Sequence, residues 1–267
     1  QLIRVPPLGV APLDKKQHSQ VSAEDREILQ NRILHMDDDV IVINKPPGLA
    51  VQGGTGITRS IDGMLDALKF EKNERPRLVH RLDKDTSGVL VVARSAGSAA
   101  KLTRSFRSRE TRKVYWAVVV GVPELDAGRI DMPLAKLPGR KGERMVHDEN
   151  AGKKAVTMFR VIERAGRKAV WLHLEPVTGR THQLRVHMAE TGTPIHGDGK
   201  YGGAGAFIPG QGLSRKLHLH ARAIRTPNPG GGLLEVIAPL PDHMLTTWRF
   251  FGFDEKTDDD PFSENPL

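Results

Sequence analysis

Apolar and polar positions alternate in short blocks along this chain, and the apolar blocks have the length of β-strands. An apolar run of about four to eight residues between turn signals is typical of a buried strand. Apolar or β-branched runs predict strands at 40–44, 89–93, 113–122, 155–162, 169–174, 217–224 and 233–237. The first ends at the Lys-Pro-Pro-Gly sequence of residues 45–48, because proline cannot continue a central ladder.

Apolar residues at helical spacing predict helices at 60–70, 96–110, about 181–190 and 241–251. Basic side chains surround the apolar face of the second helix: Lys101, Arg104, Arg107 and Arg109. Segments 128–154 and 200–212 are glycine-rich, so we expect irregular structure there. Many strands with short helices between them favour an α+β fold, a mixed, mostly antiparallel β-sheet core flanked by short helices and loops.

The chain divides into three parts of different composition. Residues 1–30 are proline-rich and then polar without a clear apolar period, so we expect a linker or arm. Residues 31–253 hold all the predicted strands and helices and are long enough for one large domain. Residues 254–267 hold six acidic side chains and one lysine, and we expect a disordered tail.

The charge is strongly positive outside that tail. The 267 residues include 40 lysines and arginines against 32 acidic residues, a net charge of +8, so the body without its tail carries +13. Such a body indicates a polyanionic partner, RNA or DNA ahead of anionic lipid. The absence of cysteine excludes disulfides, thiolate nucleophiles and cysteine-ligated zinc. No apolar run is long enough to span a bilayer, and no secretory leader pattern is visible.

Residues 79–88 (VHRLDKDTSG) lead directly into the apolar strand at 89–93. A carboxylate in a turn at the mouth of a buried strand is rigid and accessible, which makes Asp83 a candidate nucleophile or general base. A polar turn capped by its own side chains explains the same residues. The spacing of Asp83, Asp85 and Ser87 also matches the start of a calcium loop, but Arg94 stands where that loop needs glutamate.

A second polar cluster, residues 176–187 (PVTGRTHQLRVH), covers the start of a predicted helix. His182 and Arg185 share a helix face, so we expect Arg185 to point outward to an acidic group. Gly179 and Arg180 at the helix start favour a phosphate. An amphipathic helix with solvent-exposed basic residues is the plain structural alternative.

Tyrosine and histidine give weaker signals. Tyr115 has Lys113 as a basic neighbour and could stack on a nucleic-acid base, although isolated strand aromatics more commonly pack in a core. Two pairs place possible metal ligands on the same side of an extended segment: His196 with Asp198, and His218 with His220. Nothing in the sequence makes these pairs converge, so we expect no metal site.

Taken together, these stretches resemble the RluA-type family of pseudouridine synthases. The match runs in order through HRLDKDTSG at 80–88, RKVYWAVVVG at 112–121, PVTGRTHQLRVHMAETGTPIHGDGKYG at 176–202 and LHLHA at 217–221. It extends from about residue 39 to residue 239. Within the family, the sequence is most similar to the bacterial RluC-like enzymes that act on large-subunit (23S) ribosomal RNA.

The resemblance implies an enzyme that isomerises specific uridines in RNA to pseudouridine without a cofactor, in a cleft across the sheet. The family's nucleophilic aspartate falls on Asp83, its active-site tyrosine on Tyr115, and the arginine paired with the aspartate on Arg185. The arginine that can replace a flipped nucleotide falls on Arg81. Further RNA-binding candidates are Arg180 and Lys113.

The chemistry of the reaction agrees with these residue types. A glycosidic C–N bond breaks and uracil is rejoined through C5, so the target base must leave its stack. We expect Arg185 to keep the pKa of Asp83 low, so that the carboxylate is ionised. Attack on the sugar carbon, attack on the uracil ring, and sugar deprotonation assisted by Tyr115 are all compatible with the sequence.

Such enzymes usually carry a small RNA-binding domain ahead of the catalytic one. We therefore interpret residues 1–7 (QLIRVPP) as the end of a junction to a domain that this chain lacks. We expect a cytoplasmic monomer without an obligate protein partner, and an acidic tail that screens the basic cleft from non-target RNA. The alternatives are a transfer-RNA pseudouridine synthase, a non-catalytic RNA-binding module and a metal-dependent phosphodiesterase, whereas the missing cysteines exclude a zinc base deaminase.

Overall fold

The computed structural model describes residues 21–54, 56–137, 144–209, 212–258 and 260–262. Its strands are β1 (Ile33–Met36), β2 (Val40–Lys45), β3 (Arg77–Leu78), β4 (Ser87–Ala93), β5 (Arg112–Val120), β6 (Ala127–Asp131), β7 (Leu134–Leu137), β8 (Arg144–His147), β9 (Val156–Ala165), β10 (Ala169–Pro176), β11 (Leu219–Pro227) and β12 (Leu233–Ile237). Its α-helices are α1 (Ala23–Gln30), α2 (Ile61–Met64), α3 (Ala96–Ser108), α4 (Gln183–Glu190) and α5 (Asp242–Phe251), and its 3₁₀ helices are η1 (Leu65–Leu68), η2 (Gly203–Ala206) and η3 (Glu255–Asp258).

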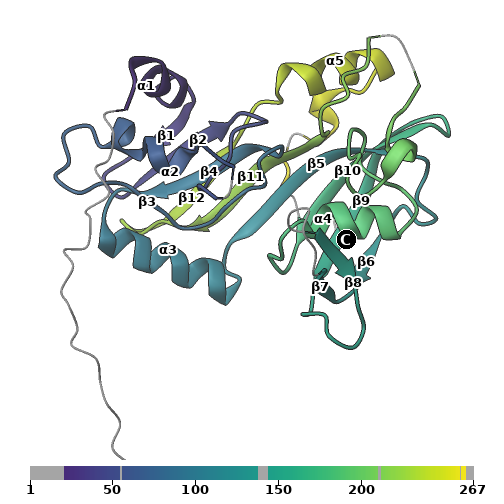
Figure 1. The fold of residues 1–267 in the computed structure, drawn as a ribbon, viewed down its shortest axis with the longest axis horizontal. Coiled ribbons are helices and arrows are strands. Elements are labelled where there is room, and N and C mark those ends of the chain that lie inside the picture. Colours follow the sequence, from purple (N-terminus) through teal and green to yellow (C-terminus); the bar gives the residue numbers. More distant parts are fainter. Residues whose placement is uncertain (1–20, 55, 138–143, 210–211, 259, 263–267) are drawn as a thin grey trace, which may run out of the picture.

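One long sheet crosses the molecule, with its strands in the order β1-β2-β4-β11-β5-β10-β9-β6 (Figure 1). Strand β12 pairs with β11, β3 pairs with β4, and β7 and β8 form a separate hairpin. Among the described strands, every pairing is antiparallel except that of β4 with β11. The predicted mixed, mostly antiparallel α+β fold is therefore confirmed.

The parallel pairing of β4 with β11 joins two halves of this sheet. It consists of two residue pairs, Ser87 with His220 and Gly88 with Ala221. Gly88 has φ +109°, and a Cβ there would overlap the backbone of Ala221. Because L side chains rarely adopt this conformation, only glycine permits so close an approach. We call β1 to β4 the N-terminal half of the sheet, and β11, β12, β5, β10, β9 and β6 its C-terminal half.

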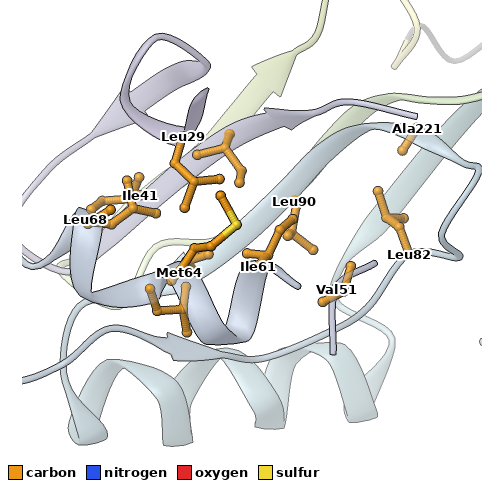
Figure 2. Close-up of a cluster of buried hydrophobic side chains, with 13 residues drawn as sticks. Leu29, Ile41, Val51, Ile61, Met64, Leu68, Leu82, Leu90 and Ala221 are labelled. Carbon is orange, nitrogen blue, oxygen red and sulfur yellow. The ribbon is translucent and has the colours of Figure 1, made fainter. Parts of the chain in front are cut away.

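The N-terminal half has apolar packing on both faces, which explains why its strands are continuous apolar runs. On one face, Leu29 of α1 and Ile61 of α2 pack on Ile41 and Leu90 (Figure 2). On the other face, Leu102 of α3 packs with alternate residues of β2 and β4. Helices α1 and α3 therefore lie on opposite sides of these strands (Figure 1).

The C-terminal half is packed in the same two-sided way. Trp116, Trp171 and Trp248 form an aromatic cluster between the sheet and α5, with ring centroids 4.6 to 6.4 Å apart. On the opposite face, Leu184 and Met188 of α4 pack on β5 and β10. Helix α4 is thereby fixed over the face of the sheet to which the side chain of Tyr115 belongs.

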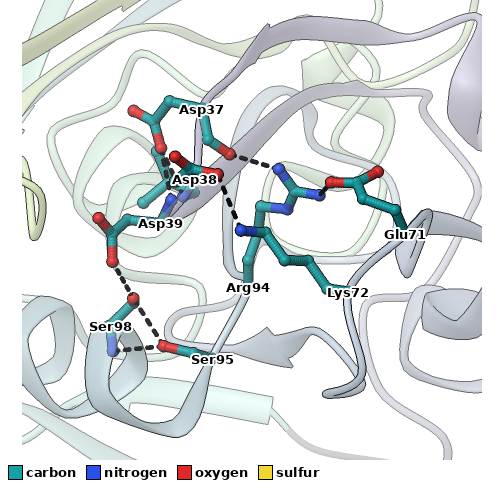
Figure 3. Close-up of polar contacts among 9 residues, drawn as sticks. Asp37, Asp38, Asp39, Glu71, Lys72, Arg94, Ser95 and Ser98 are labelled. Carbon is teal, nitrogen blue, oxygen red and sulfur yellow. Dashed lines mark hydrogen bonds and ion pairs between the residues drawn. The ribbon is translucent and has the colours of Figure 1, made fainter.

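A polar network ties the start of α3 to the N-terminal half (Figure 3). The buried Arg94 donates hydrogen bonds to the carbonyl of Asp37 (2.6 Å) and to Glu71 (2.8 Å). The Ser95 hydroxyl caps α3 by accepting from the amide of Ser98, whose own hydroxyl donates to Asp39. The first turn of α3 is thus anchored to the turn between β1 and β2.

The prediction of an arm over residues 1–30 is wrong for Ala23–Gln30, which form helix α1. Ser22 caps this helix, and Leu29 is completely buried. The helix was not predicted because the composition of α1 is largely polar and few apolar contacts hold it. Residues 1–7, interpreted as the end of a junction, lie outside the described residues.

The prediction of irregular structure at 128–154 is wrong as well, because β6, β7 and β8 lie there. Strand β6 is at the sheet edge and pairs only with β9. Its Ile130 is buried while Arg129 and Asp131 are exposed, so one face alone supplied an apolar signal.

The tail from residue 254 is not disordered in its described part. Phe262 is 3 % exposed, and its carbonyl accepts a hydrogen bond from Arg112 (2.9 Å). The Arg225 guanidinium lies 4.5 Å from the centroid of the Phe262 ring. One aromatic anchor therefore holds an acidic segment that composition alone assigned to solvent.

In the described part of the chain, no helix is long and apolar enough to cross a membrane.

Candidate active site

A cavity of about 540 Å³ opens where the loop before β4, the end of α3, strand β5 and the segment leading into α4 meet. It contains all six residues that the sequence singles out: Arg81, Asp83, Lys113, Tyr115, Arg180 and Arg185. These residues come from three separate segments of the chain. The folded chain therefore brings together side chains that only a resemblance had linked.

Asp83 lies on a loop that is held mainly through its backbone. The completely buried Lys45 donates hydrogen bonds from Nζ to the carbonyl of Lys84 (2.9 Å) and to the carbonyls of Pro46 and Leu49 (2.8 Å each). Burial lowers the pKa of Lys45 to about 7, although Asp85 and Asp83 oppose the change. The role of Lys45 was not predicted from the sequence. The feature that could have indicated it is the position of a lysine at the end of a buried strand, directly before two prolines.

Arg185 is buried rather than exposed, contrary to the expected outward orientation. Its Nε and Nη2 donate to the two carboxylate oxygens of Asp198 at 2.8 and 2.7 Å, while Nη1 lies 4.0 Å from Oδ2 of Asp83. The guanidinium also stands over the Tyr201 ring, 5.1 Å from its centroid. Asp198, considered above as a metal ligand, instead fixes Arg185 so that one nitrogen faces Asp83.

The pKa of Asp83 is raised, not lowered as expected. Burial raises it, and the positive charges of Arg185, Arg81, Lys45 and Lys200 oppose that effect without overcoming it. The Asp83 side chain is 17 % exposed and stands at the outer limit of ion-pair distance from Arg185. The effect of removing Asp83 from water therefore outweighs its attraction to the positive charges, because Arg185 makes its two shortest hydrogen bonds to Asp198 rather than to Asp83.

His182 connects the carboxylate to a second tyrosine. Its Nε2 lies 3.8 Å from Oδ1 of Asp83, and its Nδ1 lies 2.6 Å from the Tyr201 hydroxyl. That hydroxyl accepts a hydrogen bond from the amide of Met145 (3.1 Å), so its own hydrogen is free to be donated to Nδ1. Burial, reinforced by Arg185, lowers the pKa of His182 to about 3. The neutral ring then presents an Nε2–H to Asp83.

Lys113 and Tyr115 lie two residues apart on β5 and therefore face the same side of the sheet. Burial, followed by the charge of Asp83, raises the pKa of Tyr115 above its usual value, so its hydroxyl stays protonated. Burial lowers the pKa of Lys113. Arg81 and Arg180 are exposed at the rim, where Arg180 donates to the carbonyl of Lys154 (3.0 Å).

The histidines considered as metal ligands have other partners. His196 contacts the carbonyls of Ala206 (3.2 Å) and Ser214 (3.0 Å). His218 lies 2.7 Å from the hydroxyl of Thr247. His220 lies 2.9 Å from the Ser87 hydroxyl, where the two sheet halves meet. Within the described ranges, no group of three or more histidine, aspartate or glutamate side chains converges to hold a metal ion.

Known proteins share both the sequence and this fold. The family model described as RNA pseudouridylate synthase matches residues 39–190. The chain is 38 % identical over 302 aligned positions to "RNA pseudouridine synthase 4, mitochondrial" of Arabidopsis thaliana, covering 89 % of this chain and 63 % of that protein. It is 39 % identical to "Ribosomal large subunit pseudouridine synthase C" of Yersinia pestis, covering 91 % of this chain and 76 % of that protein.

A solved structure agrees with these relatives. "Human RNA Pseudouridylate Synthase Domain Containing 4" superposes with a TM-score of 0.71 and 31 % sequence identity, over 85 % of this chain and 95 % of that one. The matched family region contains Asp83, Tyr115 and Arg185. The chain belongs to the RNA pseudouridylate synthase family.

Proposed function

We propose that this chain converts uridine in RNA to pseudouridine and that Asp83 is the reacting carboxylate. The observation that carries this proposal is the meeting of Asp83, Tyr115 and Arg185 in one cavity, from a loop, a strand and a helix. In the reaction, the glycosidic bond from N1 of uracil to the ribose breaks and a bond from C5 replaces it, while N1 takes up a proton and the C5 hydrogen leaves as a proton. Substrate and product have the same composition, so no oxidant or reductant is consumed.

Arg185 keeps Asp83 reactive in this proposal. A carboxylate must be ionised to react, yet burial raises the pKa of Asp83. The Arg185 guanidinium, held by Asp198, favours the ionised form, and its effect grows when bound RNA displaces water from the cavity. His182 adds an Nε2–H directed at the same carboxylate.

Tyr115 and the rim cations hold the nucleotide in this proposal. A cavity of about 540 Å³ is in the size range of small-molecule sites, and the protonated Tyr115 offers a ring for stacking and a hydroxyl for hydrogen bonding. Arg81 lies two residues before Asp83 at the rim, where it can fill the gap left by a flipped base. Lys113 and Arg180 line the same cavity and, in this proposal, bind phosphate.

Large-subunit ribosomal RNA is the proposed substrate, because the Yersinia relative is named for the ribosomal large subunit. The cytoplasmic location, the monomeric state and the screening role of the acidic tail remain predictions from the sequence.

The deciding experiment measures tritium release from uracil-5-tritiated large-subunit ribosomal RNA in the presence of EDTA. We expect release by the wild type, none by Asp83→Asn, and near wild-type release by Asp85→Asn, which changes an exposed carboxylate of the same loop. Equal release by Asp83→Asn and wild type would overturn the assignment of Asp83.

The same assay discriminates the other candidate functions. Release from transfer RNA alone would change the substrate and keep the reaction. Release that EDTA abolishes would favour a metal-dependent enzyme. Tight RNA binding without release from any RNA would favour a non-catalytic binding module.

A further inference from the structure

Three arginines at the C-terminal end of α3 form a charged surface that the proposed reaction leaves unused: Arg104, Arg107 and Arg109. All three are exposed, and none forms an ion pair with any residue that the structure describes. Several exposed arginines elsewhere do form ion pairs: Arg59 with Asp25, Arg129 with Asp131, and Arg164 with Asp126. We call these three residues, two in α3 and Arg109 directly after it, the arginine surface.

The backbone of Arg109 is in an unusual conformation. Its φ is +66°, in the left-handed region where glycine normally ends a helix. Three residues other than glycine have a positive φ in the described chain, and two of them, Arg109 and His182, line the cavity. An arginine in this conformation makes the fold less stable than a glycine would, but it places a positive charge at the rim of the cavity.

The arginine surface is continuous with the cavity. Arg107 and Arg109 line the cavity itself. A second hollow, of about 360 Å³, extends along α3 and is lined by Ala99, Ala100, Thr103, Arg104 and Arg107. The small side chains in this hollow leave the guanidinium groups accessible to a bulky polyanion.

Helix α3 is also fixed relative to Asp83. Its first turn is anchored by the Ser95 cap and the contact of Ser98 with Asp39 (Figure 3). Near its other end, the Phe106 ring stacks on His80, with centroids 4.6 Å apart, and His80 accepts a hydrogen bond from the amide of Val91 (2.8 Å). The arginine surface therefore stands at a set distance from the carboxylate.

We propose that Arg104, Arg107 and Arg109 bind the phosphate backbone of the RNA duplex that flanks the target uridine. This inference rests on the proposed function, because a uridine held in the cavity is joined on both sides to a strand that must cross its rim. Duplex RNA is recognised mainly through its shape and its phosphates, and an arginine fork suits phosphate oxygens. From Arg104 to Arg109 the arginine surface extends about 8 Å along the helix, which suits contact with two or three neighbouring phosphates.

The test compares the triple variant Arg104→Gln/Arg107→Gln/Arg109→Gly with the control Arg26→Gln/Arg249→Gln. The control removes exposed arginines of α1 and α5, away from the cavity lining. Binding is measured by fluorescence anisotropy with a uridine-containing stem-loop RNA and with a short single-stranded oligouridine, from about 50 to 200 mM KCl. Arg109→Gly alone should fold with a melting temperature close to wild type, because glycine suits the left-handed position.

We expect the triple variant to bind the stem-loop about 10- to 100-fold more weakly at low salt. The slope of the logarithm of the binding constant against the logarithm of the salt concentration should become shallower, by the amount that corresponds to losing about two to three phosphate contacts. Oligouridine should lose much less affinity, and the control variant should resemble wild type with both RNAs. Equal losses for both RNAs, or an equal loss in the control, would overturn the proposal. So would wild-type stem-loop affinity, including the case in which the arginines support only binding to anionic vesicles.

This readout is independent of catalysis. If the wild type released no tritium but the triple variant still lost stem-loop affinity, the proposed reaction would fail while the arginine surface stood. If the wild type turned over normally and the triple variant bound the stem-loop like wild type, the arginine surface alone would fail.

Discussion

The two halves of the sheet position their functional groups in different ways. The N-terminal half holds Asp83 through the backbone of its loop, with Lys45 bound to three carbonyls and Gly88 packed on β11. The C-terminal half presents Arg185 on a regular helix and fixes it by a side-chain pair with Asp198. Substitutions near Asp83 that disturb the backbone of its loop should therefore lower the stability of the fold. Substitutions of Arg185 should alter both the charge next to Asp83 and the packing of the buried pair with Asp198.

The largest effect should come from Asp83→Asn, which keeps the shape of the side chain and removes its charge. We expect turnover to fall on the order of 10⁴-fold or more, because no other carboxylate among the described residues lines the cavity. The melting temperature should stay equal or rise, since burial raises the pKa of Asp83 and thus opposes its charged form. Tritium release and a thermal melt measure both, and a variant within tenfold of wild type would contradict this role.

Arg185→Ala should be next, with turnover reduced on the order of 10³-fold and the free energy of unfolding lowered by about 3–5 kcal/mol, because Asp198 is left buried and unpaired. Arg185→Lys should lose less of both, since it keeps the charge without the two-pronged bond. Single-turnover rates and urea unfolding measure the two effects. Equal losses for lysine and alanine would show that geometry alone matters at this position.

Gly88→Ala tests the joint between the halves. We expect the free energy of unfolding to fall by at least about 2 kcal/mol, because the new Cβ would overlap the backbone of Ala221 and the residue has a positive φ. Gly205→Ala is the matched control, since nothing lies within 4 Å of its added Cβ. Urea unfolding compares the two, and equal stability would mean that the halves are joined elsewhere.

The smallest effect, taken over one pH unit and one group, is the response to acid. Burial lowers the pKa values of His80, His218 and His220 to about 3, whereas an unfolded chain takes up these protons near pH 6.5. Their stabilisation is complete above pH 6.5 and is lost as the pH falls from there towards about 3, by about 1.4 kcal/mol per histidine per pH unit. Urea unfolding at a series of pH values should show this slope, and a flat profile would contradict neutral buried rings.

The catalytic candidates were predictable from the sequence because each stands in a long, ordered motif. The cavity confirms that Asp83, Tyr115 and Arg185 meet. The partner of Arg185 was not predictable, because Asp198 lies thirteen residues away in a glycine-rich stretch that favoured a loop or a metal ligand equally. The raised pKa of Asp83 depends on burial and on distances of a few ångströms, which no sequence pattern encodes.

The fold could be predicted from the sequence where apolar residues were continuous. The prediction failed where an element is held by very few buried residues. Strand β4 is buried on both faces and was evident as an apolar run. Helix α1 buries Leu29 with Ile28 partly buried beside it, and the tail buries Phe262 next to Pro261, so each apolar stretch is only two residues long. Edge strand β6 shows the same weakness, because only Ile130 among its five residues is buried.

The parallel pairing of β4 with β11 has a consequence for the order in which the protein is made. The partners Gly88 and Ala221 are separated by most of the catalytic region, so a growing chain cannot close the sheet until Ala221 has left the ribosome. Contacts of such long sequence separation also form slowly, because a large loop must close first. A nascent chain therefore carries Asp83 long before the cavity around it exists, and reactivity towards RNA should arise only after Ala221 has been synthesised.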